Sequence, residues 1–282
     1  MVAVYFNSQI TLEDVRTTLP VRKFAAVHAD WTQRFGSEAT FHESPRATVA
    51  QLERVHDADF VAGVLDGTRK NGFGSFALEV GEAAMWDVGA FIAAARHAAK
   101  MRENAVSIGG AFHHASFDSC HGFCTFNGLM AAAVDLRKAG YKHRVGILDL
   151  DGHFGDGTQN MIENMGLQRE IPHYIFAHEL LAPAEVEAWL NRLPYIIADM
   201  YKAGVRVLFY NAGVDTHVDD PMTKGVLSTR QLERRDNIVF GVARKLGLPV
   251  AWTLAGGYGK QLARLVELHG FAMEASLRHE KT

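Results

Sequence analysis

Short apolar runs recur along the chain and alternate with longer segments of helical periodicity. The runs are AVYF at 3–6, AVSIGG at 105–110, RVGILDL at 144–150, HYIFAH at 173–178, VRVLFY at 205–210 and PVAWTLAGG at 249–257. Continuous apolar runs of this length are typical of strands that are buried on both faces of a sheet. We therefore predict that each run contains a buried strand.

Amphipathic segments between these runs predict helices. They cover residues 48–67, 79–101, 127–140, 183–204 and 228–247. Several end in the glycine that commonly follows a helix C-terminus. The alternation of strands and helices predicts an α/β fold, a three-layer sandwich in which helices cover both faces of a mainly parallel sheet.

The chain shows no internal repeat, low-complexity tract or Pro/Ser-rich linker. We therefore expect residues 1–282 to form a single domain. The irregular segment 67–80 is the best candidate for a long functional loop.

Unusual polar residues follow four of the apolar runs. The segments are AFHHASFDSCHGFC after the run at 105–110, DGHFGDGTQ after 144–150, NAGVDTHVDD after 205–210 and LAGGYGK within and after 249–257. Ligands bind at the carboxyl ends of the strands in an open parallel sheet, so these segments are expected to meet at one edge. That edge is the predicted functional site.

Asp151 and His153 are two residues apart, so in an extended segment their side chains point the same way and can share one ion. Asp215 would supply a third ligand. Two carboxylates and one imidazole leave coordination positions open for water and substrate, as in a catalytic metal site. Oxygen and nitrogen donors suit Zn²⁺, and Fe²⁺, Co²⁺ and Mn²⁺ are also compatible with them.

His113 and His114 are the candidates for a general base and its partner, because a metal-activated water needs a nearby group to take one proton. Two adjacent histidines would repel each other if both were protonated, so each is expected to have its own carboxylate. Asp149 and Asp156 are available for this. Tyr258, which lies among glycines, can donate to the oxyanion of a tetrahedral intermediate.

The overall charge and the cysteine content exclude several other classes of protein. The formal net charge of −3 gives no basic surface for nucleic acid. Two cysteines, Cys120 and Cys124, fit a reducing, cytoplasmic setting better than a disulfide-bonded one, and they form a poor zinc site without a second pair. The first residues lack the pattern of a signal peptide, and no apolar run is long enough to cross a bilayer.

Several motifs together resemble the histone deacetylase and acetylpolyamine amidohydrolase family, which shares the arginase-like α/β fold. They are LERVHDADFV, GGAFHHASFDSCHGFCTFN, LDLDGHFGDGTQ, NAGVDTHVDDP and LAGGYG, in the family's order over residues 50 to 260 or so. The short linker GGAF before the histidine pair resembles the class IV and related bacterial branch.

The resemblance implies a zinc-dependent amidohydrolase. It implies that Asp151, His153 and Asp215 bind catalytic zinc. It also implies that His114 is the general base with Asp156 behind it.

The remaining candidate residues take their roles from the same resemblance. His113 would pair with Asp149 as an electrostatic partner, and Tyr258 would polarise the scissile carbonyl. Asp149 and main-chain carbonyls of the metal-binding loop would also hold a structural potassium ion. The expected substrate-binding residues are Gly122, Phe123, Gly256 and Gly257.

Acylated lysine side chains and acetylated polyamines are both possible substrates under this interpretation. The chain has no clear acidic residue at the rim to grip a substrate backbone, and the loop at 67–80 offers TRKN there. An arginase-like ureohydrolase is disfavoured, because LDLDGHFGD lacks a further acid two residues after His153. The alternative from a different functional class is a metal-dependent binding protein, which keeps the pocket and recognises an acylated ligand without hydrolysing it.

Overall fold

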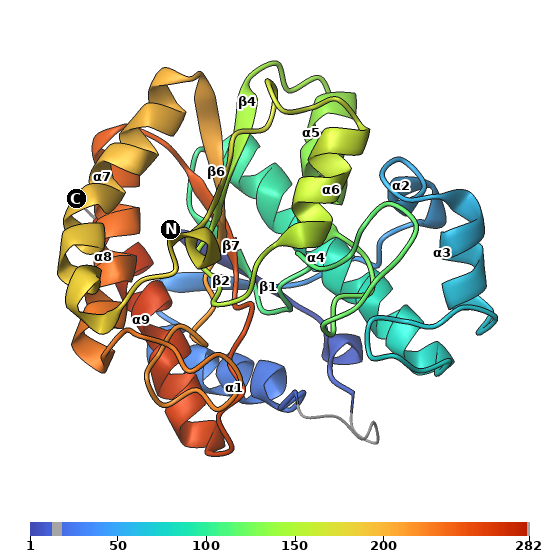
Figure 1. Ribbon diagram of the computed structural model, residues 1–282, viewed down its shortest axis with the longest axis horizontal. Helices are drawn as coiled ribbons and strands as arrows, with labels where there is room; N and C mark the ends of the chain where they lie inside the picture. Colours follow the sequence, from blue (N-terminus) through green and yellow to red (C-terminus); the bar gives the residue numbers. More distant parts are fainter. Residues whose placement is uncertain (13–18, 281–282) are drawn as a thin grey trace.

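The computed structural model describes residues 1–12 and 19–280, and its centre is a parallel sheet (Figure 1). The strand order is β2-β1-β3-β7-β6-β4-β5, and every neighbouring pair is parallel. The strands are β1 (Val2–Phe6), β2 (Ala39–Glu43), β3 (Ala105–Ser107), β4 (Arg144–Asp149), β5 (His173–Ile175), β6 (Val205–Asn211) and β7 (Val250–Thr253). Each predicted apolar run contains one of these strands, so the prediction of a parallel sheet is confirmed.

Helices cover both faces of the sheet, as the sequence predicts. They are α1 (Lys23–Phe35), α2 (Val49–Leu52), α3 (Ala58–Leu65), α4 (Leu78–Met101), α5 (Gly128–Lys138), α6 (Asp156–Asn164), α7 (Val186–Lys202), α8 (Thr229–Lys245) and α9 (Leu262–Glu280). Short 3-10 helices span Ser8–Ile10, Phe176–Glu179 and Pro183–Glu185. Helices α1, α7, α8 and α9 cover one face, and helices α2 to α6 cover the other (Figure 1).

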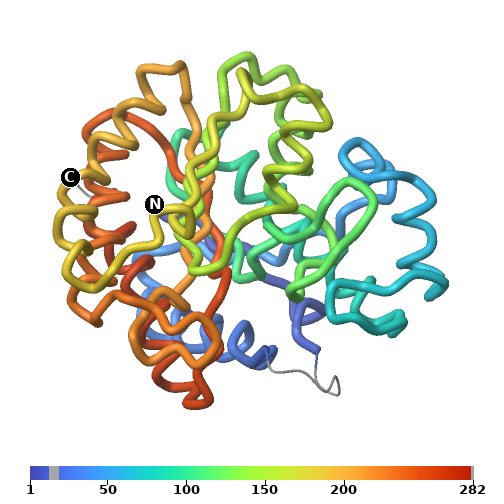
Figure 2. Tube along the Cα trace, viewed as in Figure 1, coloured from blue at the N-terminus to red at the C-terminus, as the bar shows by residue number. Residues whose placement is uncertain are grey.

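Alternating side chains of β6 belong to two hydrophobic cores, one on each face of the sheet. Val207 and Phe209 are fully buried against the helices of one face, whereas Leu208 and Tyr210 are fully buried against those of the other. Burying a large apolar side chain contributes about 1.5–3 kcal/mol, so both faces of this central strand stabilise the fold. On the face that carries Leu208 and Tyr210, α1 also packs against α9. An early helix of the chain therefore lies beside the last one (Figure 2).

The structure departs from the predicted elements at a few places. The predicted helix at 48–67 is two helices, because Asp57 leaves the helical conformation and caps α3 by accepting the Phe60 N–H. Strand β2 was not predicted: it is an edge strand in which only Ala39 is fully buried. Within the described part of the chain, no helix combines the length and apolar character that a bilayer span requires.

Candidate functional site

The predicted site residues meet at the carboxyl end of four neighbouring strands. In the order β3-β7-β6-β4, these strands lead into the histidine pair, the Tyr258 turn, the Asp215 loop and the segment from Asp149 to Asp156. This order places the four segments side by side, although more than 100 residues lie between the histidine pair and the Tyr258 turn along the chain. The predicted position of the site, at the carboxyl ends of the strands, agrees with this arrangement.

Asp151, His153 and Asp215 form a cluster in which one ligand atom of each lies within 4.8 Å of the others. The Nδ1 atom of His153 is 3.2 Å from Asp151 Oδ1 and 2.9 Å from Asp215 Oδ2. Both carboxylates are fully buried, and the imidazole is partly exposed toward solvent. The cluster is therefore buried on the protein side and open on the imidazole side.

The surroundings of this cluster fit a divalent cation. The Gly256 N–H donates to Asp151 Oδ2 at 2.8 Å, and the Gly152 N–H donates to Asp215 Oδ1 at 2.9 Å. The Oδ2 atom of Asp215 is buried and, apart from its contact with His153 Nδ1, accepts no hydrogen bond from the described residues. Burial and the charge of Asp151 raise the pKa of Asp215 to about 7. A dication would neutralise this repulsion between two buried carboxylates, and the donor set has the composition of an open zinc site.

Two glycines keep the backbone close to these carboxylates. A Cβ at Gly256 would lie 2.6 Å from carboxylate atoms of both Asp151 and Asp215, and one at Gly213 would lie 2.5 Å from Asp151. No side chain fits at either position without moving a ligand. Gly256, which we predict to contact the substrate, thus also donates a direct hydrogen bond to the candidate metal ligand Asp151.

Each histidine of the pair has its own carboxylate, as predicted from the sequence. His113 Nδ1 is 2.8 Å from Asp149 Oδ2, and His114 Nδ1 is 2.6 Å from Asp156 Oδ1. Asn211, the last residue of β6, also donates to Asp149 Oδ1 at 2.9 Å. These contacts orient both rings with Nδ1 toward the protein, which leaves Nε2 of each ring to face the site.

The two adjacent histidines have opposite electrostatic environments. Burial opposes the charged form of His113, but Asp149 and Asp151 outweigh this effect and raise its pKa to about 9. Burial, together with the neighbouring charge of His113, lowers the pKa of His114 to about 4. At neutral pH His113 is thus a cation and His114 a neutral imidazole, which is the form that can accept a proton.

Tyr258 lies beside the metal cluster with its ring against His153. The two ring centroids are 5.6 Å apart in an edge-to-face arrangement, and the tyrosine side chain is almost completely buried. Burial and the charges of Asp151 and Asp215 raise the pKa of the Tyr258 hydroxyl well above its usual range. The hydroxyl stays protonated and is available as a hydrogen-bond donor.

Two buried charged residues hold the backbone turn that carries Tyr258. Asp220 Oδ2 accepts the Tyr258 N–H at 2.8 Å, and Lys23 Nζ donates to the carbonyl oxygens of Ala255 at 2.7 Å and Gly257 at 3.3 Å. Burial lowers the pKa of Lys23 to about 8. The turn is therefore fixed from both sides, and the glycine-rich sequence does not make Tyr258 free to swing.

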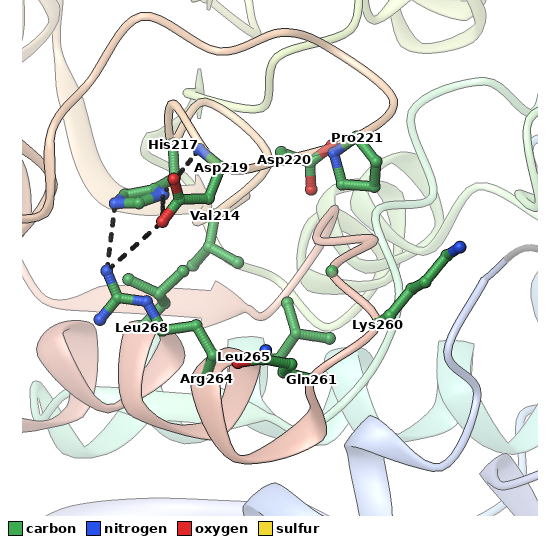
Figure 3. Close-up of a pocket in the computed structure, with 11 residues that line it drawn as sticks. Val214, His217, Asp219, Asp220, Pro221, Lys260, Gln261, Arg264, Leu265 and Leu268 are labelled. Atoms are coloured by element: carbon green, nitrogen blue, oxygen red, sulfur yellow. Dashed lines mark hydrogen bonds and ion pairs between the residues drawn. The ribbon is translucent and has the colours of Figure 1, made fainter.

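A surface cleft of about 410 Å³ lies beside this turn (Figure 3). It is lined by Asp220 and Pro221 from one side and by the start of α9 from the other. Arg264 of α9 contacts His217 across the cleft, with Nη2 3.4 Å from Nε2 (Figure 3). Asp220 thus lines the cleft and also accepts the hydrogen bond of the Tyr258 N–H.

Phe123, in the turn with Gly122, contacts the ring of Tyr258. The Phe123 ring is 6.0 Å from that of Tyr258 and 5.3 Å from that of Phe73. The Phe123 N–H donates to the carbonyl of Gly72 at 2.8 Å, so the segment at 67–80 supports this aromatic wall. Gly122 has a φ of 56°, and a Cβ there would lie 2.4 Å from the His114 ring, so the turn also positions the candidate base.

His121, Lys23 and Asp220 are residues of the site that the sequence pattern does not reveal. Asp220 lies in a loop, but its carboxylate is buried and accepts three backbone N–H groups, those of Met222, Thr223 and Tyr258. His121 hydrogen-bonds to Asp156 through Nε2 at 2.8 Å. Lys23 is the first residue of α1, a helix that was not predicted from the sequence, and its side chain is buried.

Comparison with known proteins identifies the family. The model of the histone deacetylase domain matches residues 20–168, more than half of the chain. The chain belongs to this family. The matched part includes the histidine pair and the segment from Asp149 to Asp156, whereas Asp215 and Tyr258 lie beyond it.

Relatives of this histone deacetylase domain include proteins with two different descriptions. Histone deacetylase 2 of Arabidopsis thaliana is 28% identical over 64% of this chain and 50% of its own. Acetylpolyamine amidohydrolase 2 of Pseudomonas aeruginosa is 30% identical over 52% of this chain and 48% of its own. The alignments thus span about half the length of these two relatives. An uncharacterised protein of Picosynechococcus matches at 29% identity over 80% of this chain and 81% of its own.

The fold matches a solved structure along almost the whole chain. The crystal structure of the HDA15 HD domain superposes with a TM-score of 0.79 at 17% identity, over 98% of this chain and 90% of that one. This match confirms the predicted deacetylase-like α/β fold.

Proposed function

We propose that this protein is a zinc-dependent amidohydrolase that removes an acetyl or other acyl group from a lysine side chain or a small amine. The observation that carries the proposal is the candidate metal cluster of Asp151, His153 and Asp215, beside which the pKa of His113 is raised and that of His114 is lowered. Family membership supports the reaction class. The relatives' descriptions as a histone deacetylase and an acetylpolyamine amidohydrolase support both substrate types.

Zinc held by Asp151, His153 and Asp215 would polarise the amide carbonyl and lower the pKa of an attacking water. His114, neutral at physiological pH, takes the proton of that water on Nε2 and Asp156 stabilises the resulting imidazolium. The same proton then passes from His114 to the departing amine nitrogen, which leaves as the free amine.

His113 and Tyr258 stabilise the negative charge that develops on the carbonyl oxygen. His113 is a buried cation fixed by Asp149, so it acts electrostatically without changing its proton. Tyr258 donates its hydroxyl proton in a hydrogen bond to that oxygen, because its high pKa keeps the hydroxyl protonated. Phe123, whose ring centroid is 6.0 Å from that of Tyr258, forms a wall of the proposed tunnel for the acylated amine.

The proposal extends to the ions and to the cellular setting. We propose that Asp149 and main-chain carbonyls of its loop hold a structural potassium ion, and that Fe²⁺ can replace Zn²⁺ at the catalytic centre. Cys120 and Cys124 are free thiols, which supports a reducing, cytoplasmic compartment.

The experiment is hydrolysis of a substrate panel by enzyme of known metal content. The panel contains acetyl-, trifluoroacetyl- and long-chain acyl-lysine peptides together with acetylated polyamines. Turnover that is lost on chelation and restored by Zn²⁺ is the expected result, and the preferred substrate reports the length and rim of the pocket. An enzyme with one zinc per chain that hydrolyses none of these amides would contradict the proposal and favour a non-catalytic binding protein.

A further inference from the structure

A second cluster of metal-ligating side chains lies at the outer side of the histidine pair. Asp156 places one carboxylate oxygen 2.6 Å from His114 Nδ1 and the other 2.8 Å from His121 Nε2. Ligand atoms of these three residues all lie within 4.8 Å of one another. The first cluster contains two carboxylates and one imidazole, whereas this one contains two imidazoles and one carboxylate.

The backbone holds His121 in this position. His121 and Cys124 form an antiparallel bridge, in which the Cys124 N–H donates to the His121 carbonyl at 2.9 Å. Gly122 and Phe123, which form the turn, both have positive φ. The resulting turn places the His121 ring 4.7 Å from the His114 ring between centroids. The two imidazoles are therefore on the same side of Asp156 before any ion binds.

The cluster is accessible to ions from solvent. The side chain of His121 is 58% exposed and that of Asp156 is 39% exposed, whereas that of His114 is 13% exposed. Tetrahedral zinc with bonds of 2.0–2.1 Å needs ligand atoms about 3.3 Å apart, so the present separations must open by half an ångström or so. The exposed His121 side chain can move by this amount without disturbing the core. Two imidazoles and one carboxylate are ligands that Zn²⁺ accepts readily.

We propose that His114, His121 and Asp156 form a second, solvent-facing Zn²⁺ site that inhibits the enzyme when it fills. The inhibitory part of this inference rests on the proposed function of His114, whereas the binding part does not. A zinc ion on His114 Nδ1 displaces the proton that now points to Asp156, and the neutral ring then carries that proton on Nε2. Nε2 faces the substrate side as a donor, so it can no longer accept a proton from water.

Binding is tested by measuring zinc stoichiometry on purified, metal-free protein titrated with Zn²⁺ in equilibrium dialysis. We expect two bound zinc ions per chain for the wild type and one for His121→Gln. His143→Gln is the matched control, because His143 is also exposed but lies at the opposite, N-terminal end of β4. It should bind two. Equal stoichiometry in all three proteins would overturn the second site.

Inhibition is tested by following amide hydrolysis of the same three proteins against free Zn²⁺, each normalised to its own maximum. Loss of one of three ligands should raise the inhibitory zinc concentration at least about tenfold in His121→Gln and leave it unchanged in His143→Gln. Identical inhibition curves would refute the inhibitory role. If the protein hydrolyses no amide but the stoichiometries still differ, the proposed function fails and the second site stands.

Discussion

His114 Nδ1 lies 2.6 Å from Asp156 Oδ1, although 42 positions separate the two residues in the sequence. Asp156 is the first residue of α6, and His114 belongs to the loop that follows β3. The contact fixes the tautomer of His114 with its proton on Nδ1, so that Nε2 remains the basic nitrogen. The function we propose for this site depends on that arrangement.

Replacement of His114 by Ala should reduce kcat by about 10²–10⁴, because the attacking water loses its proton acceptor. The catalytic zinc ion should stay bound, since His114 is not among its proposed ligands, and only the second, solvent-facing zinc ion should be lost. Steady-state kinetics with metal analysis of the same sample checks both expectations. Turnover close to that of the wild type would exclude His114 as the base.

Tyr258→Phe removes one hydroxyl and keeps the ring that packs against His153 and Phe123. We expect kcat to fall by about 10²–10³ with little change in KM, as for the loss of one oxyanion donor. Thermal unfolding should remain close to that of the wild type. If the KM values of the variant discriminated less between substrates while kcat stayed at the wild-type value, Tyr258 would be assigned to the pocket wall instead.

Asp219 and Asp220 are adjacent acids with opposite surroundings, so they form a matched pair for a test of the Tyr258 turn. Asp219 is 69% exposed at its side chain, whereas Asp220 is buried and accepts the Tyr258 N–H. Asp220→Ala leaves buried N–H groups without partners, so it should lower the free energy of unfolding by about 1–3 kcal/mol and also lower kcat. Asp219→Ala should match the wild type in denaturant unfolding and in kinetics. Equal effects of the two substitutions would contradict this assignment.

The lowered pKa of His56 makes the stability of the fold depend on pH. Its Nδ1–H donates to the Ser116 carbonyl at 2.8 Å and its Nε2 accepts the Asn127 N–H at 2.9 Å, so the folded state needs the neutral ring. Burial lowers the pKa of His56 from 6.5 to about 4. Between these values the unfolded chain binds a proton that the folded chain does not, so the free energy of unfolding decreases as pH falls. The contribution of this one group reaches about 3 kcal/mol.

The measurement for His56 is urea unfolding from pH 7 to pH 4 of the wild type and of His56→Asn. The variant should be less stable at pH 7, and the difference between the two proteins should shrink toward pH 4. A difference that stays constant over this range would show that His56 does not titrate with folding.

The pattern of apolar runs was sufficient to predict the central strands, because β4, β6 and β7 are buried on both faces. It could not predict β2, whose residues Phe41 to Glu43 are progressively exposed at the edge of the sheet. A strand with one buried face and few apolar residues looks like a loop when its partner strand is unknown.

The same limit applies to the site. The candidate ligands Asp151 and His153 could be identified because they are two residues apart. Asp220 and Lys23 could not, since their partners are backbone groups of the Tyr258 turn 38 and more than 200 positions away. A buried lysine or aspartate is also rare enough that exposure is the reasonable expectation from sequence alone.

The central claim is that Asp151, His153 and Asp215 hold the ion that makes this protein an amidohydrolase. The most direct measurement is a titration of metal-free protein with Zn²⁺, in which bound zinc and amide hydrolysis are followed together for the wild type and for Asp215→Ala. Activity of the wild type should rise in proportion to the first equivalent of bound zinc, and Asp215→Ala should neither retain that equivalent nor gain activity. Hydrolysis by zinc-free protein, or a full first equivalent in Asp215→Ala, would contradict the account.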